Sequence, residues 1–174
     1  MKKLLSCTKT VIVLLLATVI TLGFYAYMLA RPISYDMEYH NVTEYEGSVF
    51  EGTLRFSSDG TVFNKNTNFG EELQYRYYYK NGYVFFLMAE TDEECEKEIA
   101  SINDNFDEAV NTPFYADEIN SFRMIASEGD GYSTVYTCTS AIIFAAAFGA
   151  FALILAGFTV AAFVLGRKSK KQVA

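Results

Sequence analysis

The sequence has little histidine, cysteine or proline, with one, three and two of these residues among 174. With a single histidine, any nucleophile that needs an imidazole base would have to use His40, which stands two residues after Glu38. We expect His40 to be a solvated surface residue, because it falls on the polar side of an alternating segment. A glycine-rich phosphate loop is missing as well. The sequence therefore singles out no catalytic residue and no cofactor.

Metal ligands at recognisable spacings are also missing. A structural zinc site needs paired Cys or His ligands, and His40, Cys95 and Cys138 have no such spacing. Residues 103–107 imitate the start of an EF-hand calcium loop, but Glu108 stands where that loop needs glycine. We therefore expect no bound metal.

Acidic residues are absent from both ends of the chain. All 21 Asp and Glu lie between Asp36 and Asp130, and residues 31–139 set only 7 Lys and Arg against them, a net charge of −14. The other seven cations lie in residues 1–10 and 167–174. A domain of charge −14 repels nucleic acid, so no nucleic-acid partner is expected. Charge sorted by position in this way is typical of membrane proteins.

Two long segments carry no charge. Residues 11–30 would form a helix of about 30 Å, the hydrocarbon thickness of a bilayer, and residues 141–165 a longer one. We predict transmembrane helices at residues 11–30 and 140–166, in contact with the lipid bilayer. Neither contains an ionisable residue that could serve an ion path, which argues against a transporter or channel.

The basic tails set the expected orientation, because Lys and Arg are retained on the cytoplasmic side. Residues 1–10 and 167–174 are then cytoplasmic tails of a multi-pass protein of the cell membrane, and residues 31–139 form an extracytoplasmic domain. A cleaved signal peptide ending at Ala30 is the alternative for the first span. The second span resembles a sortase-anchored tail, but the required Leu-Pro-x-Thr-Gly motif does not precede it.

A stripe of small residues marks one face of the second span. Ala145, Gly149, Ala152 and Ala156 recur at spacings that allow another helix to approach closely. The first span is the nearest partner, and a second copy in a homo-oligomer is the next. The stripe is equally consistent with a plain abundance of Ala and Gly.

The middle of the chain reads as short strands joined by turns. Alternation at residues 33–40 predicts a strand, Asp59-Gly60 predicts a hairpin turn, and Asn81-Gly82 predicts a second one. The strands expected around and after these turns are residues 52–56, 61–64, 75–80, 83–88, 119–127 and 132–137. Thr91 and Glu94 form a capping box that opens an amphipathic helix over residues 92–110. We predict an α+β fold in which two transmembrane helices flank a small antiparallel sheet with one amphipathic helix.

A two-residue turn at Asn81-Gly82 fixes the register of its hairpin, from Lys80 opposite Tyr83 outwards. One face then suits the core, and the other is of mixed character. The mixed face collects Arg76, Tyr78, Lys80, Tyr83 and Phe85, followed by Leu87. This face is either covered by the amphipathic helix, which we favour, or an exposed contact surface for a partner.

Two cysteines lie in the outer domain. Cys95 and Cys138 form the only disulfide that the predicted topology permits, because Cys7 is on the other side of the membrane. The alternative, which we favour, is two small apolar thiols buried in a core.

The turn residues also carry a resemblance. The segment Phe56-Ser57-Ser58-Asp59-Gly60-Thr61-Val62, followed by the Tyr-rich strand and by Lys80-Asn81-Gly82-Tyr83, resembles small extracytoplasmic β domains in uncharacterised membrane proteins and lipoproteins of Firmicutes. The resemblance covers residues 52–88. It implies a bacterial cell envelope and brings no catalytic residue with it.

These observations favour a non-enzymatic protein that displays an acidic, aromatic-rich domain outside the membrane, where it recognises a membrane or envelope protein or a ligand. One alternative is an accessory subunit of a larger membrane complex, held by the small-residue stripe. Another is a membrane-tethered hydrolase, which would require two carboxylates facing each other across a cleft.

Overall fold

The computed structural model describes residues 8–45, 47–66, 70, 72–112, 115–127 and 133–171. The chain divides into two compact units. One contains helix α2 (Thr8–Ala30) and most of helix α5 (Thr139–Lys171), and the other is the domain formed by residues Arg31–Ile142.

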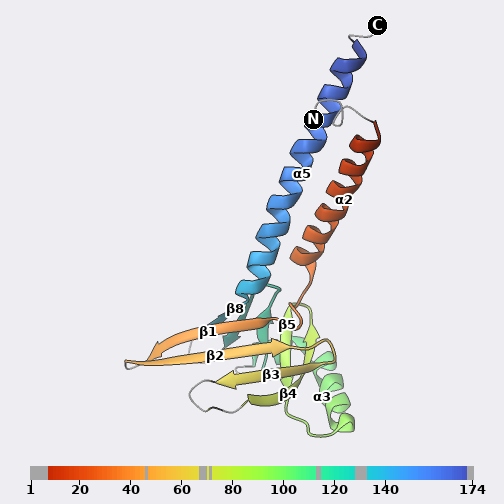
Figure 1. The fold of residues 1–174 in the computed structure, drawn as a ribbon. Coiled ribbons are helices and arrows are strands. Elements are labelled where there is room, and N and C mark those ends of the chain that lie inside the picture. Colours follow the sequence, from red (N-terminus) through yellow and green to blue (C-terminus); the bar gives the residue numbers. More distant parts are fainter. Residues whose placement is uncertain are drawn as a thin grey trace. The chain divides into compact units, whose positions relative to one another are not determined.

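The domain is built on eight antiparallel strands (Figure 1). They are β1 (Glu38–Tyr45), β2 (Ser48–Phe56), β3 (Thr61–Asn66), β4 (Glu72–Lys80), β5 (Tyr83–Leu87), β6 (Asp117–Ile119), β7 (Arg123–Ser127) and β8 (Ser133–Thr137). Each strand pairs with the next in sequence, and β8 returns to β1, so the sheet closes into a barrel. The antiparallel sheet is confirmed; its closure goes beyond the prediction, because it depends on strands at opposite ends of the domain.

The hairpin of β4 and β5 has the predicted register. Its pairs run from Lys80 with Tyr83 to Arg76 with Leu87. Asn81 and Gly82 take φ values of 51° and 90°, the left-handed conformations that a tight two-residue turn requires. Turn chemistry alone therefore determines which side chains share each face of this hairpin.

The barrel core lies on the face of the β4–β5 hairpin that the sequence suits to it, which consists of Tyr75, Tyr77, Tyr79, Val84, Phe86 and Met88. Of these residues, Met88 is the exception, because it is 79% exposed. Tyr39, Phe56, Val62 and Val84 are fully buried, and the rings of Tyr77 and Phe86 pack beside them. The Phe56 ring meets Tyr39 and Tyr77 edge to face, at centroid distances of 5.6 and 5.1 Å. Such pairs are attractive beyond the area they bury. The core of this small barrel is therefore largely aromatic.

The predicted capping box is present at Thr91, whose hydroxyl accepts from the Glu94 N–H while the Glu94 side chain accepts from the Thr91 N–H. The single helix predicted for residues 92–110 was wrong, because two helices, α3 (Asp92–Asp104) and α4 (Phe106–Asn111), occupy the segment. Asn105 separates them with φ −126° and ψ 43°, outside the helical region.

The observed strands differ in their bounds from the predicted ones, and two segments differ in more than length. Residues 33–37 do not extend β1: Asp36 has a φ of 58°, and its N–H donates to the Phe56 carbonyl at 2.8 Å, so the segment turns before Glu38. Residues 119–127 form two strands, because the Asn120 side chain accepts from the N–H groups of Phe122 and Arg123 and stabilises a turn. The sequence also predicts a turn at residues 127–131 before the last strand, and residues 128–131 of it lie outside the described residues.

Helices α2 and α5 contain segments of 22 and 27 residues that are long and apolar enough to cross a membrane. The coarse form of the prediction, two apolar helices flanking the sheet in sequence, is therefore confirmed.

Candidate binding groove

The barrel is weakly closed between its first and last strands. β1 pairs with β2 along its whole length, in eight residue pairs. Among the described residues, its register with β8 contains one pair, His40 with Thr137. Beyond that pair, the hairpin of β1 and β2 extends as a long two-stranded arm (Figure 1). The Asn41 amide donates to the Val135 carbonyl at 2.9 Å, so a side chain replaces the backbone ladder here. We call this place the β1–β8 seam.

Hydrogen-bond alternation shows which backbone groups of β1 lie at the seam. The connection between β1 and β2 has two residues, which makes Tyr45 and Ser48 a hydrogen-bonded pair. Hydrogen-bonded pairs alternate along an antiparallel ladder, so the backbone groups of Thr43 and Asn41 also bond to β2. The N–H and C=O groups of Val42 and Glu44 then point to the other edge, the one that His40 shares with β8. Among the described residues, no register pair joins Val42 or Glu44 to β8. β1 therefore has an open strand edge.

A groove of about 250 Å³ lies beside this edge. It is lined by Asn41 and Thr43 of β1, by Phe50, Glu51 and Gly52 of β2, and by Thr134 and Tyr136 of β8. Phe50 and Gly52 are on the same strand face as the buried Leu54, so the groove continues the concave core face outwards. It is a barrel mouth with aromatic and hydroxyl-bearing walls, a common position for ligand sites.

Gly52 permits the close approach of Tyr136. A Cβ atom at Gly52 would lie 3.1 Å from the Tyr136 hydroxyl oxygen and 3.2 Å from its Cε1. The Tyr136 ring therefore lies against the β2 backbone and forms one wall of the groove. Any larger residue at position 52 would displace that wall.

The hairpin of β1 and β2 beside the groove is acidic, and Glu51 is the acidic residue that lines the groove itself. Residues 38–54 contain Glu38, Glu44, Glu46 and Glu51 and neither lysine nor arginine, and residues 133–137 carry no charge. Side chains of Glu44 and Glu51 are exposed. The local potential therefore favours a cation at the seam.

His40 lies on the outer barrel face next to the seam. Its Nε2 is 3.2 Å from a Glu38 carboxylate oxygen, and its Nδ1 is 3.2 Å from the Thr53 hydroxyl. This carboxylate–imidazole–hydroxyl chain is half exposed to water on a convex surface. Within the parts of the chain that the structure describes, no group of three His, Cys, Asp or Glu could hold a metal.

The residues predicted as a contact surface lie under α3 and α4 instead. Phe85 is fully buried and contacts the rings of Phe106 and Tyr115. The Tyr83 ring meets Phe106 at 6.2 Å. This is the helix-covered arrangement that the sequence favoured, and it leaves Phe85 inaccessible to a partner.

The polar members of that set hold the helices as well. The Tyr78 hydroxyl and the Lys80 ammonium group donate to the Asn103 side chain at 3.0 and 2.6 Å, and the Lys80 nitrogen lies 4.8 Å from the Phe106 ring centroid. Arg76 pairs with Asp92 in the first turn of α3. All five residues thus contribute to docking α3 and α4 on the barrel.

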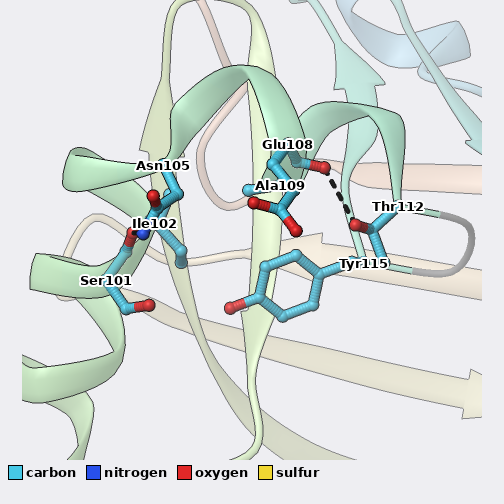
Figure 2. Close-up of a pocket in the computed structure, with 7 residues that line it drawn as sticks. All are labelled: Ser101, Ile102, Asn105, Glu108, Ala109, Thr112 and Tyr115. Atoms are coloured by element: carbon cyan, nitrogen blue, oxygen red, sulfur yellow. Dashed lines mark hydrogen bonds between the residues drawn. The ribbon is translucent and has the colours of Figure 1, made fainter.

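A second hollow of about 290 Å³ lies over α3 and α4 (Figure 2). Its floor includes Ile102 and Ala109, and Tyr115 forms one side with its hydroxyl towards Ser101. The Thr112 hydroxyl donates to the Glu108 carbonyl at 2.8 Å, and Asn105 donates to the Ser101 carbonyl at 3.4 Å. These polar groups are therefore used to end the helix turns rather than to converge on a ligand.

A third hollow, of about 520 Å³, lies between the first part of β4 and the end of β5, before α3 begins. Arg76 and Glu90 line it, together with Met88, whose side chain is 79% exposed. Because Arg76 pairs with Asp92, the strongest local cation is already matched by a carboxylate.

Cys95 and Cys138 are free and lie in separate clusters. Cys95 packs with Phe85 and Ile102 under α3, whereas Cys138 packs with Tyr39 and Ile33 in the barrel core. The candidate disulfide is therefore absent from the structure, and both thiols are core residues, which is the alternative that the sequence favoured. Burial raises the pKa of the Cys138 thiol, which keeps it protonated and unreactive.

The small-residue stripe faces α2. Ala145 and Ala152 are buried, and Ala156 is half-buried. A Cβ atom added at Gly149 would lie 3.2 Å from the Cε2 atom of the Tyr25 ring, so the glycine allows the ring to approach closely. One turn further, the hydroxyl oxygens of Thr18 and Thr159 are 3.2 Å apart. This arrangement agrees with the prediction that the first apolar segment, α2, is the partner of the small-residue stripe.

We predict that Gly149→Leu separates the two helices, because its side chain has to displace the Tyr25 ring. The measurement is disulfide trapping between Thr18→Cys and Thr159→Cys in membranes, which we expect to fall several-fold. Gly157→Leu is the matched control, since nothing lies within 4 Å of its added Cβ. Equal trapping in both leucine variants would contradict the contact.

Sequence reasoning missed the seam and its groove. The signal available for the first hairpin was Gly47, which has a φ of 77° at the connection between β1 and β2. The groove itself has no local signal, because β8 is far along the chain from β1 and β2. A comparison with protein-family models, with curated proteins and with solved structures finds no match to this chain.

Proposed function

We propose that the protein is a membrane-anchored binding module of the bacterial cell envelope. Helices α2 and α5 anchor it, both termini are cytoplasmic, and the barrel binds a partner outside the membrane through the groove at the β1–β8 seam. The observation that carries this proposal is the open edge of β1 beside an aromatic-lined groove, in a domain bounded by two apolar helices.

The surfaces of α2 and α5 support the membrane anchor. Among the described residues, ten large apolar or aromatic side chains of α2, and as many of α5, are exposed. An apolar surface of this size is favourable in lipid and costly in water. The basic tails and the acidic domain then support cytoplasmic termini and an extracytoplasmic barrel.

The hydroxyl groups inside these helices are suited to lipid. Thr18, Thr21 and Thr159 each donate to the carbonyl four residues earlier, at 2.8 Å. A hydroxyl without a partner is costly in hydrocarbon, so these bonds remove the main obstacle to burying three threonines in a bilayer. They leave the helices with an almost wholly apolar exterior.

We predict that a membrane-impermeant maleimide labels the full-length Met88→Cys variant in intact bacteria, because this exposed position lies in the extracytoplasmic domain. Cys7 is expected to react only after the membrane is permeabilised. Cys95 and Cys138 are buried and provide a low background in the wild-type chain. The measurement is the labelled fraction before and after permeabilisation.

Cys7→Ser combined with Met88→Cys is the control that assigns each signal to one thiol. Labelling of Cys7 in intact cells, with the thiol introduced at position 88 protected until permeabilisation, would reverse the topology and overturn the proposal. An N-terminal tag that stays with the mature protein would exclude cleavage of the first span.

A further inference from the structure

We propose that the partner is an extended basic peptide segment, which adds to the barrel as a strand along the open edge of β1. This inference rests on the proposed function, because it specifies what the groove at the β1–β8 seam binds.

The backbone of β1 is prepared for strand addition. Val42 and Glu44 direct two N–H and two C=O groups to the seam, where the β1–β8 register has already ended. The other edge of β1 is held by eight pairs with β2, so the added strand meets a formed template rather than a loop. Main-chain hydrogen bonds to such an edge supply affinity for extended peptides of many sequences.

The groove supplies places for side chains. In an added strand, alternate side chains point to the concave face, where Phe50 and Tyr136 form the walls and Thr43 leaves room between them. The remaining side chains point outwards beside Val42, which is 67% exposed. Apolar or hydroxyl-bearing residues therefore fit inwards.

Charge selects a basic peptide. Between Glu38 and Leu54 the hairpin has glutamates but no lysine or arginine. The next cation, Arg55, lies opposite Glu38 at the end of the hairpin away from Glu44. Lysines of a strand bound at the seam therefore lie near Glu44 and Glu51. A second copy of the chain would bring another such acidic arm, from a domain of net charge −14, to the same edge. Electrostatic complementarity therefore favours a basic partner over self-association.

The test uses the full chain in lipid nanodiscs and a synthetic peptide of about ten residues in which lysine alternates with threonine and valine. Affinity is measured by fluorescence anisotropy of the labelled peptide. We expect the lysine peptide to bind at least about tenfold more tightly than a matched peptide with glutamate in place of lysine. Added salt should reduce this difference.

Two substitutions at one position separate backbone pairing from side-chain contact. Val42→Pro removes the N–H that faces the seam while leaving the β1–β2 ladder, and an edge position tolerates proline. Val42→Thr keeps the N–H and is the matched control. We expect the proline variant to lose about tenfold or more in affinity and the threonine variant about twofold or less. Glu44→Gln should weaken the lysine peptide alone.

Each outcome decides one point. If both variants keep the wild-type circular dichroism spectrum and bind equally, strand addition is overturned. If the glutamate peptide binds as well as the lysine peptide, the basic partner is overturned. If the wild-type chain dimerises through this edge and binds neither peptide, the occupant is a second copy and the inference fails. None of these results affects the maleimide labelling of Cys7 and of the Met88→Cys variant, which tests the proposed membrane anchoring separately.

Discussion

Replacing Phe56 by alanine is expected to lower the free energy of unfolding by about 3–5 kcal/mol. Phe56 is fully buried, and its ring contacts Tyr39, Tyr77 and Phe86, so the substitution leaves a cavity in the centre of an aromatic core. Domains of this size are stable by about 5–15 kcal/mol, so the loss takes a large part of the total.

Urea unfolding of the full chain in micelles, followed by tyrosine circular dichroism, measures this loss. Phe50→Ala is the matched control, because Phe50 is 38% exposed at the groove and its removal leaves no closed cavity. We expect the control to cost about 1 kcal/mol or less. Equal losses in the two variants would show that the core is not centred on Phe56.

Raising the pH from about 10 to about 12 is expected to remove about 2 kcal/mol of stability through Tyr39 alone. Burial raises the pKa of Tyr39 from 10.0 to about 12, against the opposing effect of the Ser34 N–H, which donates to its hydroxyl oxygen at 2.8 Å. The Tyr39 hydroxyl donates in turn to the Asn120 carbonyl at 3.1 Å.

The direction of this pH effect follows from the protonation of Tyr39 in the folded and the unfolded chain. Below pH 10 the phenol is neutral in both, and its contribution to stability is complete. Between pH 10 and about 12 the unfolded chain loses the Tyr39 proton while the folded barrel keeps it, so stability falls as pH rises. Burial also raises the pKa of Tyr77, with a further contribution from nearby Tyr35, and this adds to the fall in the same direction.

The measurement is urea unfolding at several pH values from about 8 to about 11.5, where Tyr39→Phe should show a shallower fall by up to about 1.4 kcal/mol per pH unit. At neutral pH the same variant should be less stable by about 1–3 kcal/mol, because the Ser34 N–H and the Asn120 carbonyl lose their shared partner. An unchanged pH slope would show that Tyr39 is not desolvated in the folded domain.

Local chemistry made several elements predictable. Asn81 and Gly82 impose a tight turn, and the turn sets the register of β4 and β5 without help from the rest of the fold. Thr91 and Glu94 satisfy each other's backbone groups at the start of α3. These are interactions between residues close in sequence, so reading the sequence was enough.

Other elements depended on distant partners. The alternation at residues 33–40 predicted one strand, but Ile33 enters the core from a turn in which Asp36 bonds to the end of β2. The sequence favoured core positions for Cys95 and Cys138 over a disulfide, but it did not show that the two thiols belong to different clusters. The pattern showed that these residues are buried but not which surface buries them.

By itself, the sequence determined two apolar helices, an antiparallel sheet, the β4–β5 register and the separation of charge between domain and tails, because each follows from composition or from neighbours along the chain. The closure of the sheet, its one described register pair between β1 and β8 (His40 with Thr137), and the groove beside that pair could be seen only in the folded domain. Closure depends on how the accumulated twist of eight strands brings β1 next to β8, and no short segment of the sequence encodes how far apart these two strands lie.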